Sequence, residues 1–112
     1  MQTIYFDIPD ITQYVDYISP MSLEGNVTVL VVFKQLYRSD DVLLDIYLNE
    51  ITNDTKIVSS KLLTPNAILS APNFDIGFEY YIECVDPKDS MKKVTKYNTK
   101  DFQLKFTKYE DE

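Results

Sequence analysis

The residues of this chain that could do chemistry are a single cysteine and several aspartates, because the sequence contains no histidine. Without histidine, the commonest general base and metal ligand is missing, and so are the Ser-His-Asp and Cys-His catalytic arrangements. Cys84 is in phase with Tyr80 and Ile82 in an alternating apolar pattern. That phase predicts an inert, buried thiol, because a reactive cysteine needs an exposed and electropositive setting.

The remaining carboxylates include two pairs in polar turns: Asp40 with Asp41, and Asp86 with Asp89. Carboxylate oxygens are preferred calcium ligands, but neither pair has the alternating spacing and closing glutamate of a dedicated calcium loop. We interpret the pairs first as turn-capping residues, and a calcium-dependent module is a weaker hypothesis. The chain also lacks a glycine-rich phosphate loop and paired CxxC elements. The sequence therefore predicts no enzyme, no cofactor and no metal site.

One carboxylate, Asp45, interrupts an apolar strand pattern between Leu44 and Ile46. A buried and unpaired charge at this position would be strongly destabilising. We therefore predict that Asp45 faces solvent, accepts hydrogen bonds from neighbouring backbone, or pairs with a lysine or arginine.

The nine tyrosines suggest a stacking platform for single-stranded nucleic acid, but such platforms need a basic groove beside the rings. Glu79 and Glu83 flank the tyrosine pair at 80–81, and the net charge of the chain is −7. Both features oppose contact with phosphates. Tyrosine is equally suited to protein interfaces, so no sequence-specific nucleic-acid partner is predicted.

Apolar residues alternate with period two along much of the chain, which predicts strands, and no long helical pattern is present. The expected strands lie at 3–8, 14–18, 27–34, 42–48, 56–63, 78–85 and 102–107. Pro20 is expected to end the second region, and 64–75 is expected to be a loop with a brief extended or helical piece. Six to seven strands with closely spaced turns are typical of an all-β antiparallel β-sandwich or small β-barrel.

The length of the chain predicts a single β domain over residues 1–112. Residues 86–101 are expected to form an exposed, mobile polar loop, and the acidic end at 109–112 is expected to fray. The lysines concentrated from 86 to 108 form either a solvated edge or an electrostatic match to the acidic half of a neighbouring copy. The opening residues lack a basic segment followed by an apolar one, so no secretory signal is expected, and no apolar run is long enough to span a bilayer. We therefore expect a soluble protein of the cytoplasm with no membrane partner.

The segment from Val27 to Leu48 is expected to form the central hairpin, and its first strand is apolar on both faces. The core of a single sandwich covers only one of these two faces. The second face predicts an interface between subunits, and a core that covers both faces is the alternative.

The order of these elements resembles the baseplate plug family, a group of small phage-tail proteins first named from a cyanophage contractile tail. A short strand ending in "DIP" precedes a long apolar strand, a hairpin enters "VLLDIYLNE", and "IGFEYYIECVDP" precedes the closing "FQLKFTK". Leu44-Asp45-Ile46-Tyr47 matches the core of the family signature, and Leu62 and Leu63 fall where a later leucine is expected. Val42 and Leu43 depart from the usual Trp-Tyr, and Ser60 stands where a glycine is common.

The resemblance implies a non-catalytic structural subunit, multimeric near the junction of tube and spike in a phage or tailocin baseplate. Its implied partners are copies of itself and the tail hub, spike and tube or tube-initiator proteins. It would be present in the host cytoplasm during assembly and then in the virion or tailocin baseplate. The candidate interface residues are Leu30, Val32, Tyr47, Tyr80, Tyr81, Lys92, Lys93 and Lys96. The alternative is a free-standing β-sandwich module that binds a carbohydrate or peptide through exposed tyrosines and the 86–101 loop.

Overall fold

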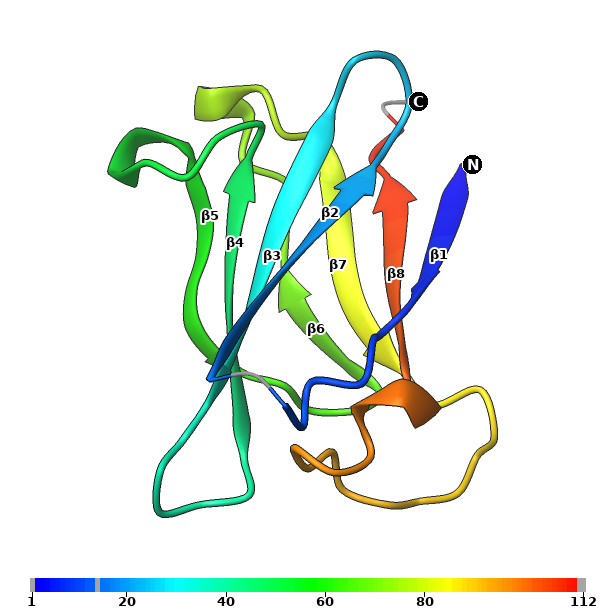
Figure 1. The fold of residues 1–112 in the computed structure, drawn as a ribbon. Coiled ribbons are helices and arrows are strands. Elements are labelled where there is room, and N and C mark those ends of the chain that lie inside the picture. The colour runs from blue at the N-terminus through cyan, green and yellow to red at the C-terminus, as the bar shows by residue number, and fades with distance from the viewer. Residues whose placement is uncertain (1, 14, 111–112) are drawn as a thin grey trace.

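A computed structural model describes residues 2–13 and 15–110, and these residues form eight strands in two antiparallel sheets. The sheets have the orders β1-β8-β7-β6 and β2-β3-β4-β5, and they stack as the two layers of a sandwich (Figure 1). The strands are β1 (Thr3–Asp7), β2 (Asp16–Ser22), β3 (Thr28–Gln35), β4 (Val42–Leu48), β5 (Lys56–Leu62), β6 (Ala67–Ser70), β7 (Tyr80–Val85) and β8 (Gln103–Lys108). Short 3-10 helices lie at Asn53–Thr55, Phe74–Ile76 and Thr99–Asp101. The all-β prediction is confirmed, and the architecture is the sandwich.

Two strands differ from the expectation. β6 comes from the segment predicted as a loop with a brief extended or helical piece, and it pairs with β7 through an irregular register. β2 continues through Pro20, which lies opposite Leu30 instead of ending the strand. A proline is tolerated there because β2 is an edge strand, where a missing N–H interrupts no inner ladder. Tyr14, the expected start of this strand, lies outside the described residues.

The core lies between the two sheets and is built from the inward-facing residues of each alternating strand. Val31 and Phe33 of β3 and Ile46 of β4 are completely buried from one sheet. From the other sheet, Phe106 of β8 packs edge-on against Phe6 of β1, with 5.6 Å between the ring centroids. Burial of this apolar surface is the main stabilising contribution to the fold.

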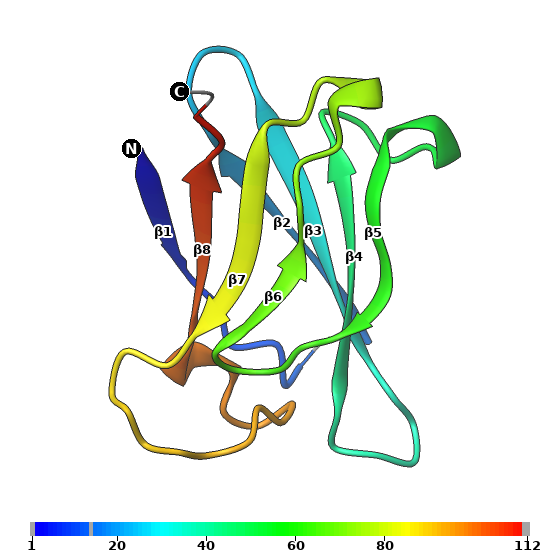
Figure 2. The same cartoon turned by 180° about the vertical axis from the view of Figure 1, so that it is seen from behind.

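The segment 86–101 lies at the same end of the sandwich as the β3–β4 turn (Figures 1 and 2). Although exposure was expected throughout this segment, Val94 and Thr99 are buried. The Thr99 hydroxyl donates a hydrogen bond of 2.7 Å to the carbonyl of Pro9, so the second half of the segment is tied to the body of the domain. Its first half, 87–93, is exposed.

The chain end was expected to fray, but the backbone N–H of Tyr109 donates to the carbonyl of Glu79 at 2.7 Å. Residues 111 and 112 of that acidic end lie outside the described residues. None of the described helices is long and apolar enough to cross a membrane.

Candidate interaction surfaces

The outward side of the β2-β3-β4-β5 sheet carries a surface that we call the outer apolar face. Its apolar members are Ile18, Pro20, Leu30, Val32, Leu43, Tyr47 and Leu62. Figure 1 views the molecule from this side, and no other strand lies in front of the sheet. Ile18 and Leu62 are 52% and 44% exposed, so large apolar side chains at both edges of the face remain in contact with water.

Asp45 lies at the centre of the outer apolar face and is only 3% exposed. Its Oδ1 accepts a hydrogen bond of 2.7 Å from the backbone N–H of Ser60, and its Oδ2 forms an ion pair with Lys34. The Lys56 ammonium is 3.9 Å from Oδ1 and 5.4 Å from the centre of the Tyr47 ring. Of the three predicted arrangements for Asp45, the structure has the backbone hydrogen bond and the lysine pair.

The ion pair keeps Asp45 charged. Burial alone would raise the pKa of the Asp45 carboxyl, but the hydrogen bonds from Lys34 and from the Ser60 N–H outweigh it and lower the pKa below its ordinary value. The same hydrogen bond raises the pKa of Lys34. Both groups therefore remain ionised at neutral pH, and the pair acts as a fixed structural contact.

A β-bulge in β5 makes this contact possible. Leu44 pairs with Lys61 and Ile46 pairs with Val58, so Ser59 and Ser60 together lie opposite Asp45. The φ angle of Ser60 is 48°, in the left-handed region that favours glycine. Because the bulge takes the Ser60 N–H out of the regular ladder, the Asp45 carboxylate supplies its acceptor.

The structure gathers three of the predicted interface residues on the outer apolar face: Leu30, Val32 and Tyr47. Leu30 is half-buried there, but Val32 and Tyr47 are only 8% and 9% exposed, so neighbouring side chains of the same chain already cover most of both. Tyr80 faces the core and is 4% exposed, which leaves almost none of its side chain available to a partner. Tyr81 points outward from the opposite sheet. The predicted set therefore divides between the two sheets and the core.

Two of the three predicted loop lysines pair within the chain. The Lys93 ammonium is 2.9 Å from Asp41, and the Lys96 ammonium is 4.0 Å from Asp40, while Lys92 is exposed. The Lys96 N–H also donates to the Asp40 carbonyl at 2.8 Å. The hydrogen bond from Lys93 lowers the pKa of Asp41. These contacts join the lysine-bearing segment to the β3–β4 turn of the same molecule.

The second aspartate pair of the calcium hypothesis lies in a local turn. Asp86 accepts hydrogen bonds from the backbone N–H of Ser90 at 2.9 Å and from its hydroxyl at 2.8 Å. The N–H of Asp89 donates to the Asp86 carbonyl at 3.2 Å. Within residues 2–13 and 15–110, no three acidic or cysteine side chains cluster as a metal site would require.

Cys84 lies in the core, as its phase predicted, and its side chain is completely buried. Burial raises the pKa of the Cys84 thiol to about 12. The thiol is therefore protonated at neutral pH. Because only the thiolate is a strong nucleophile, Cys84 is unreactive in the folded protein.

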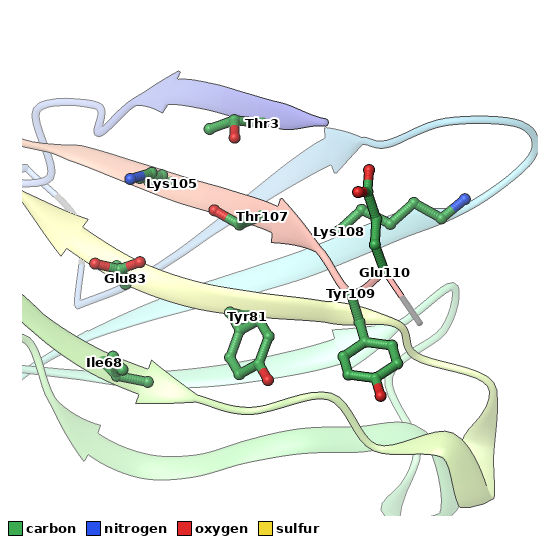
Figure 3. A pocket seen from close by; sticks show the side chains of 9 residues that line it. All are labelled: Thr3, Ile68, Tyr81, Glu83, Lys105, Thr107, Lys108, Tyr109 and Glu110. Carbon is green, nitrogen blue, oxygen red and sulfur yellow. The ribbon is translucent and has the colours of Figure 1, made fainter. Parts of the chain in front are cut away.

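A shallow groove of about 430 Å³ crosses the outward side of the other sheet. Figure 3 shows the rings of Tyr81 and Tyr109 on one side of this groove, with Ile68 beside Tyr81. Glu83, Lys105 and Thr107 lie along the adjoining strands β7 and β8. The groove thus combines aromatic surface with a row of polar groups.

No family model, curated protein or solved structure matches the chain. The alternating pattern identified Tyr81 as an exposed aromatic candidate but missed Ile68 and Tyr109, which come from distant parts of the sequence. Only the register of β6, β7 and β8 brings these three side chains to one surface.

Proposed function

We propose that this protein is a non-catalytic structural subunit of a contractile-tail baseplate in a phage or tailocin. In this proposal it assembles near the tube–spike junction with copies of itself and with hub, spike and tube or tube-initiator proteins. Assembly takes place in the host cytoplasm, and the particle baseplate is the final location. The outer apolar face is the surface that packs against an adjoining subunit.

The exposed apolar composition of that face carries the proposal. Ile18 and Leu62 occupy opposite edge strands, and Leu30 and Leu43 lie half-buried between them. Covering these side chains with a partner would remove apolar area from water, which favours association by about 25 cal/mol per Å² before the costs of ordering. The charge at the centre of the face is already paired, because Asp45 is bonded to Lys34. A partner would therefore meet no uncompensated buried charge.

The β-bulge in β5 supports the part of the proposal that rests on the resemblance to the baseplate plug family. The Leu44–Tyr47 segment carries the resemblance, and Ser60 stands where the family commonly has glycine. These two parts are in direct contact, because the Ser60 N–H donates to Asp45. The φ of Ser60 is 48°, a conformation that glycine adopts without strain, so a glycine preference at this position has a physical reason.

Assembly can be tested by mixing the purified chain with tube, hub and spike proteins of a contractile tail. Light scattering after size exclusion and negative-stain imaging would follow the complexes. We expect the chain to enter a defined multimeric complex, and Ile18→Lys and Leu62→Glu to weaken it. Both side chains are largely exposed, so these variants should fold normally.

The matched control is Tyr37→Ser, which alters an exposed residue in the β3–β4 turn, away from the face. This variant should assemble like the parent protein. A chain that remains monomeric with every partner would overturn the proposal, and so would full assembly of both face variants.

A further inference from the structure

The groove on the β1-β8-β7-β6 sheet has an apolar strip made of Ile68, Tyr81 and Tyr109. Ile68 is 62% exposed on the edge strand β6, and Tyr109 follows the end of β8. Figure 3 shows the two tyrosine rings projecting to the same side of the groove. A strip of this kind offers ring faces and a branched apolar side chain to the flat apolar surface of a small ligand.

The Tyr109 ring is held in place before any ligand binds. It packs edge-on against Phe74, with 5.2 Å between the ring centroids. Its backbone is fixed by the hydrogen bond to the Glu79 carbonyl. A ring that is already positioned loses little conformational entropy on binding, which favours its use as a contact surface.

A polar row adjoins this strip. Glu83 lies directly opposite Lys105 in the β7–β8 register, and Thr107 lies opposite Tyr81 on the same pair of strands. The row therefore offers a carboxylate that accepts hydrogen bonds, an ammonium that donates them, and a hydroxyl that does both. Ligand groups that combine donor and acceptor character, above all alcohols, match such a row.

The charges of the groove are balanced. Its lining contains two acidic and two basic side chains: Glu83, Glu110, Lys105 and Lys108. Lys108 is also paired with Glu24 at 3.5 Å. A phosphate-bearing ligand would require an excess of lysine or arginine, and a cationic ligand would require an excess of carboxylate. The balance therefore favours a ligand without net charge.

An extended peptide fits this position less well than a sugar. Peptides that bind β-sheets commonly add a strand at a free edge, where unpaired backbone groups are available. The polar row instead lies on β7 and β8, which are the two inner strands of the sheet. Recognition along the polar row must therefore come from side chains.

We propose that the groove binds a neutral pyranose chain, with the C–H face of one sugar on the apolar strip and its hydroxyls on the polar row. The site is on the opposite sheet from the outer apolar face. It therefore adds a binding activity that is independent of assembly, and each proposal can fail without the other.

Titration of the ¹⁵N-labelled protein with four neutral oligosaccharides tests the site: cellotetraose, maltotetraose, mannotetraose and tetra-N-acetylchitotetraose. We expect at least one of them to cause saturable shifts of backbone amide signals around Ile68, at 81–83 and at 105–109. Raising NaCl from about 50 mM to about 300 mM should change the affinity less than about twofold, because the ligand carries no charge.

Substitutions can distinguish a loss of sugar stacking from a loss of folding. Tyr81→Ala should weaken binding roughly tenfold or more, whereas Tyr81→Phe retains the ring and should retain most of the affinity. Ile68→Arg places a bulky cation in the groove at a largely exposed position, so it should abolish binding in a folded protein. Tyr37→Ala changes an exposed tyrosine elsewhere and should bind like the parent.

The proposal is overturned if none of the four sugars gives saturable shifts. Shifts outside the groove, or shifts that persist unchanged in both Tyr81→Ala and Ile68→Arg, would also overturn it. Binding that falls steeply with salt would identify a charged ligand and contradict the neutral-sugar assignment.

Discussion

The backbone N–H of Ser60 in β5 donates a 2.7 Å hydrogen bond to the Asp45 carboxylate in β4, fifteen residues earlier in the chain. The contact accounts for three local features together: a charge in the middle of an apolar strand, a bulge in the neighbouring strand, and a left-handed serine. The Lys34 ammonium completes the arrangement by pairing with the second carboxylate oxygen. Asp45 thus links β4 to β5 at the bulge.

Asp45→Ala should lower the free energy of unfolding by about 2–3 kcal/mol, because it removes the acceptor of a buried N–H and the partner of Lys34. Urea denaturation followed by circular dichroism measures the change. Asp40→Ala is the matched control, since this carboxylate is mostly exposed, and it should cost less than about 1 kcal/mol. Equal losses in the two variants would show that the Asp45 contacts contribute no special stability.

The dependence of stability on pH should also show the contributions of Asp45 and Lys34. The folded pKa of Asp45 is below its ordinary value of 3.8, so its contribution is complete above about pH 4 and is lost as the pH falls through the folded pKa. The folded pKa of Lys34 is above 10.5, so its contribution is complete below that pH and is lost as the pH rises further.

Thermal unfolding across the acid range should therefore show a smaller loss of stability for Asp45→Asn than for the parent. Asp41 and Asp86, whose pKa values are also lowered, are common to both proteins, so the difference isolates Asp45. If the stability of the two proteins fell equally as the pH was lowered, the lowered pKa of Asp45 would be contradicted.

Ser60→Gly should raise the free energy of unfolding by about 0.5–1 kcal/mol. Glycine relieves the strain of the left-handed φ, and this gain outweighs the extra entropy of the unfolded chain. Ser59→Gly is the matched control in the adjacent position of the same strand. It should instead destabilise by about 0.5–1 kcal/mol, because that φ is not left-handed. Destabilisation of similar size in both variants would argue against strain at Ser60.

Most of the fold was predictable from the sequence, because period-two alternation depends on local residues alone. The inward faces of β3, β4, β7 and β8 follow directly from it. β6 was expected only as a brief extended or helical piece, because prolines flank a short apolar run, and its pairing with β7 is what makes it a strand. The continuation of β2 through Pro20 was missed for a similar reason, since edge position is a property of the whole sheet.

The surfaces were less predictable, because they depend on which segments meet in space. The alternating pattern limited Asp45 to three arrangements, but the acceptor role toward Ser60 depends on a bulge that no local pattern specifies. From the sequence, the lysine-bearing segment was expected either to be exposed to solvent or to contact a neighbouring copy. Lys93 instead meets Asp41 of its own chain, because the β3–β4 turn and that segment share one end of the sandwich.

The pair of Lys93 and Asp41 should contribute little to stability despite its short distance. The Lys93 side chain is 70% exposed, and solvent screens such a pair. A double-mutant cycle with Lys93→Ala and Asp41→Ala should give a small coupling that declines as salt is added. Lys92→Ala, at an exposed neighbouring position, should show no coupling to Asp41→Ala. A strong coupling that resists added salt would show that the pair is shielded from water.

Cys84 should resist thiol reagents as long as the domain is folded. It lies between Ala67 of β6 and Leu104 of β8, and its raised pKa of about 12 leaves almost no thiolate at neutral pH. Labelling with Ellman's reagent should therefore be complete within the mixing time in concentrated urea and slow in native buffer. In native buffer the rate should follow the opening of the sheet and rise in Asp45→Ala, because that variant populates the open state more often. Rapid stoichiometric labelling of the native protein would place the thiol at the surface and contradict the packing of β7.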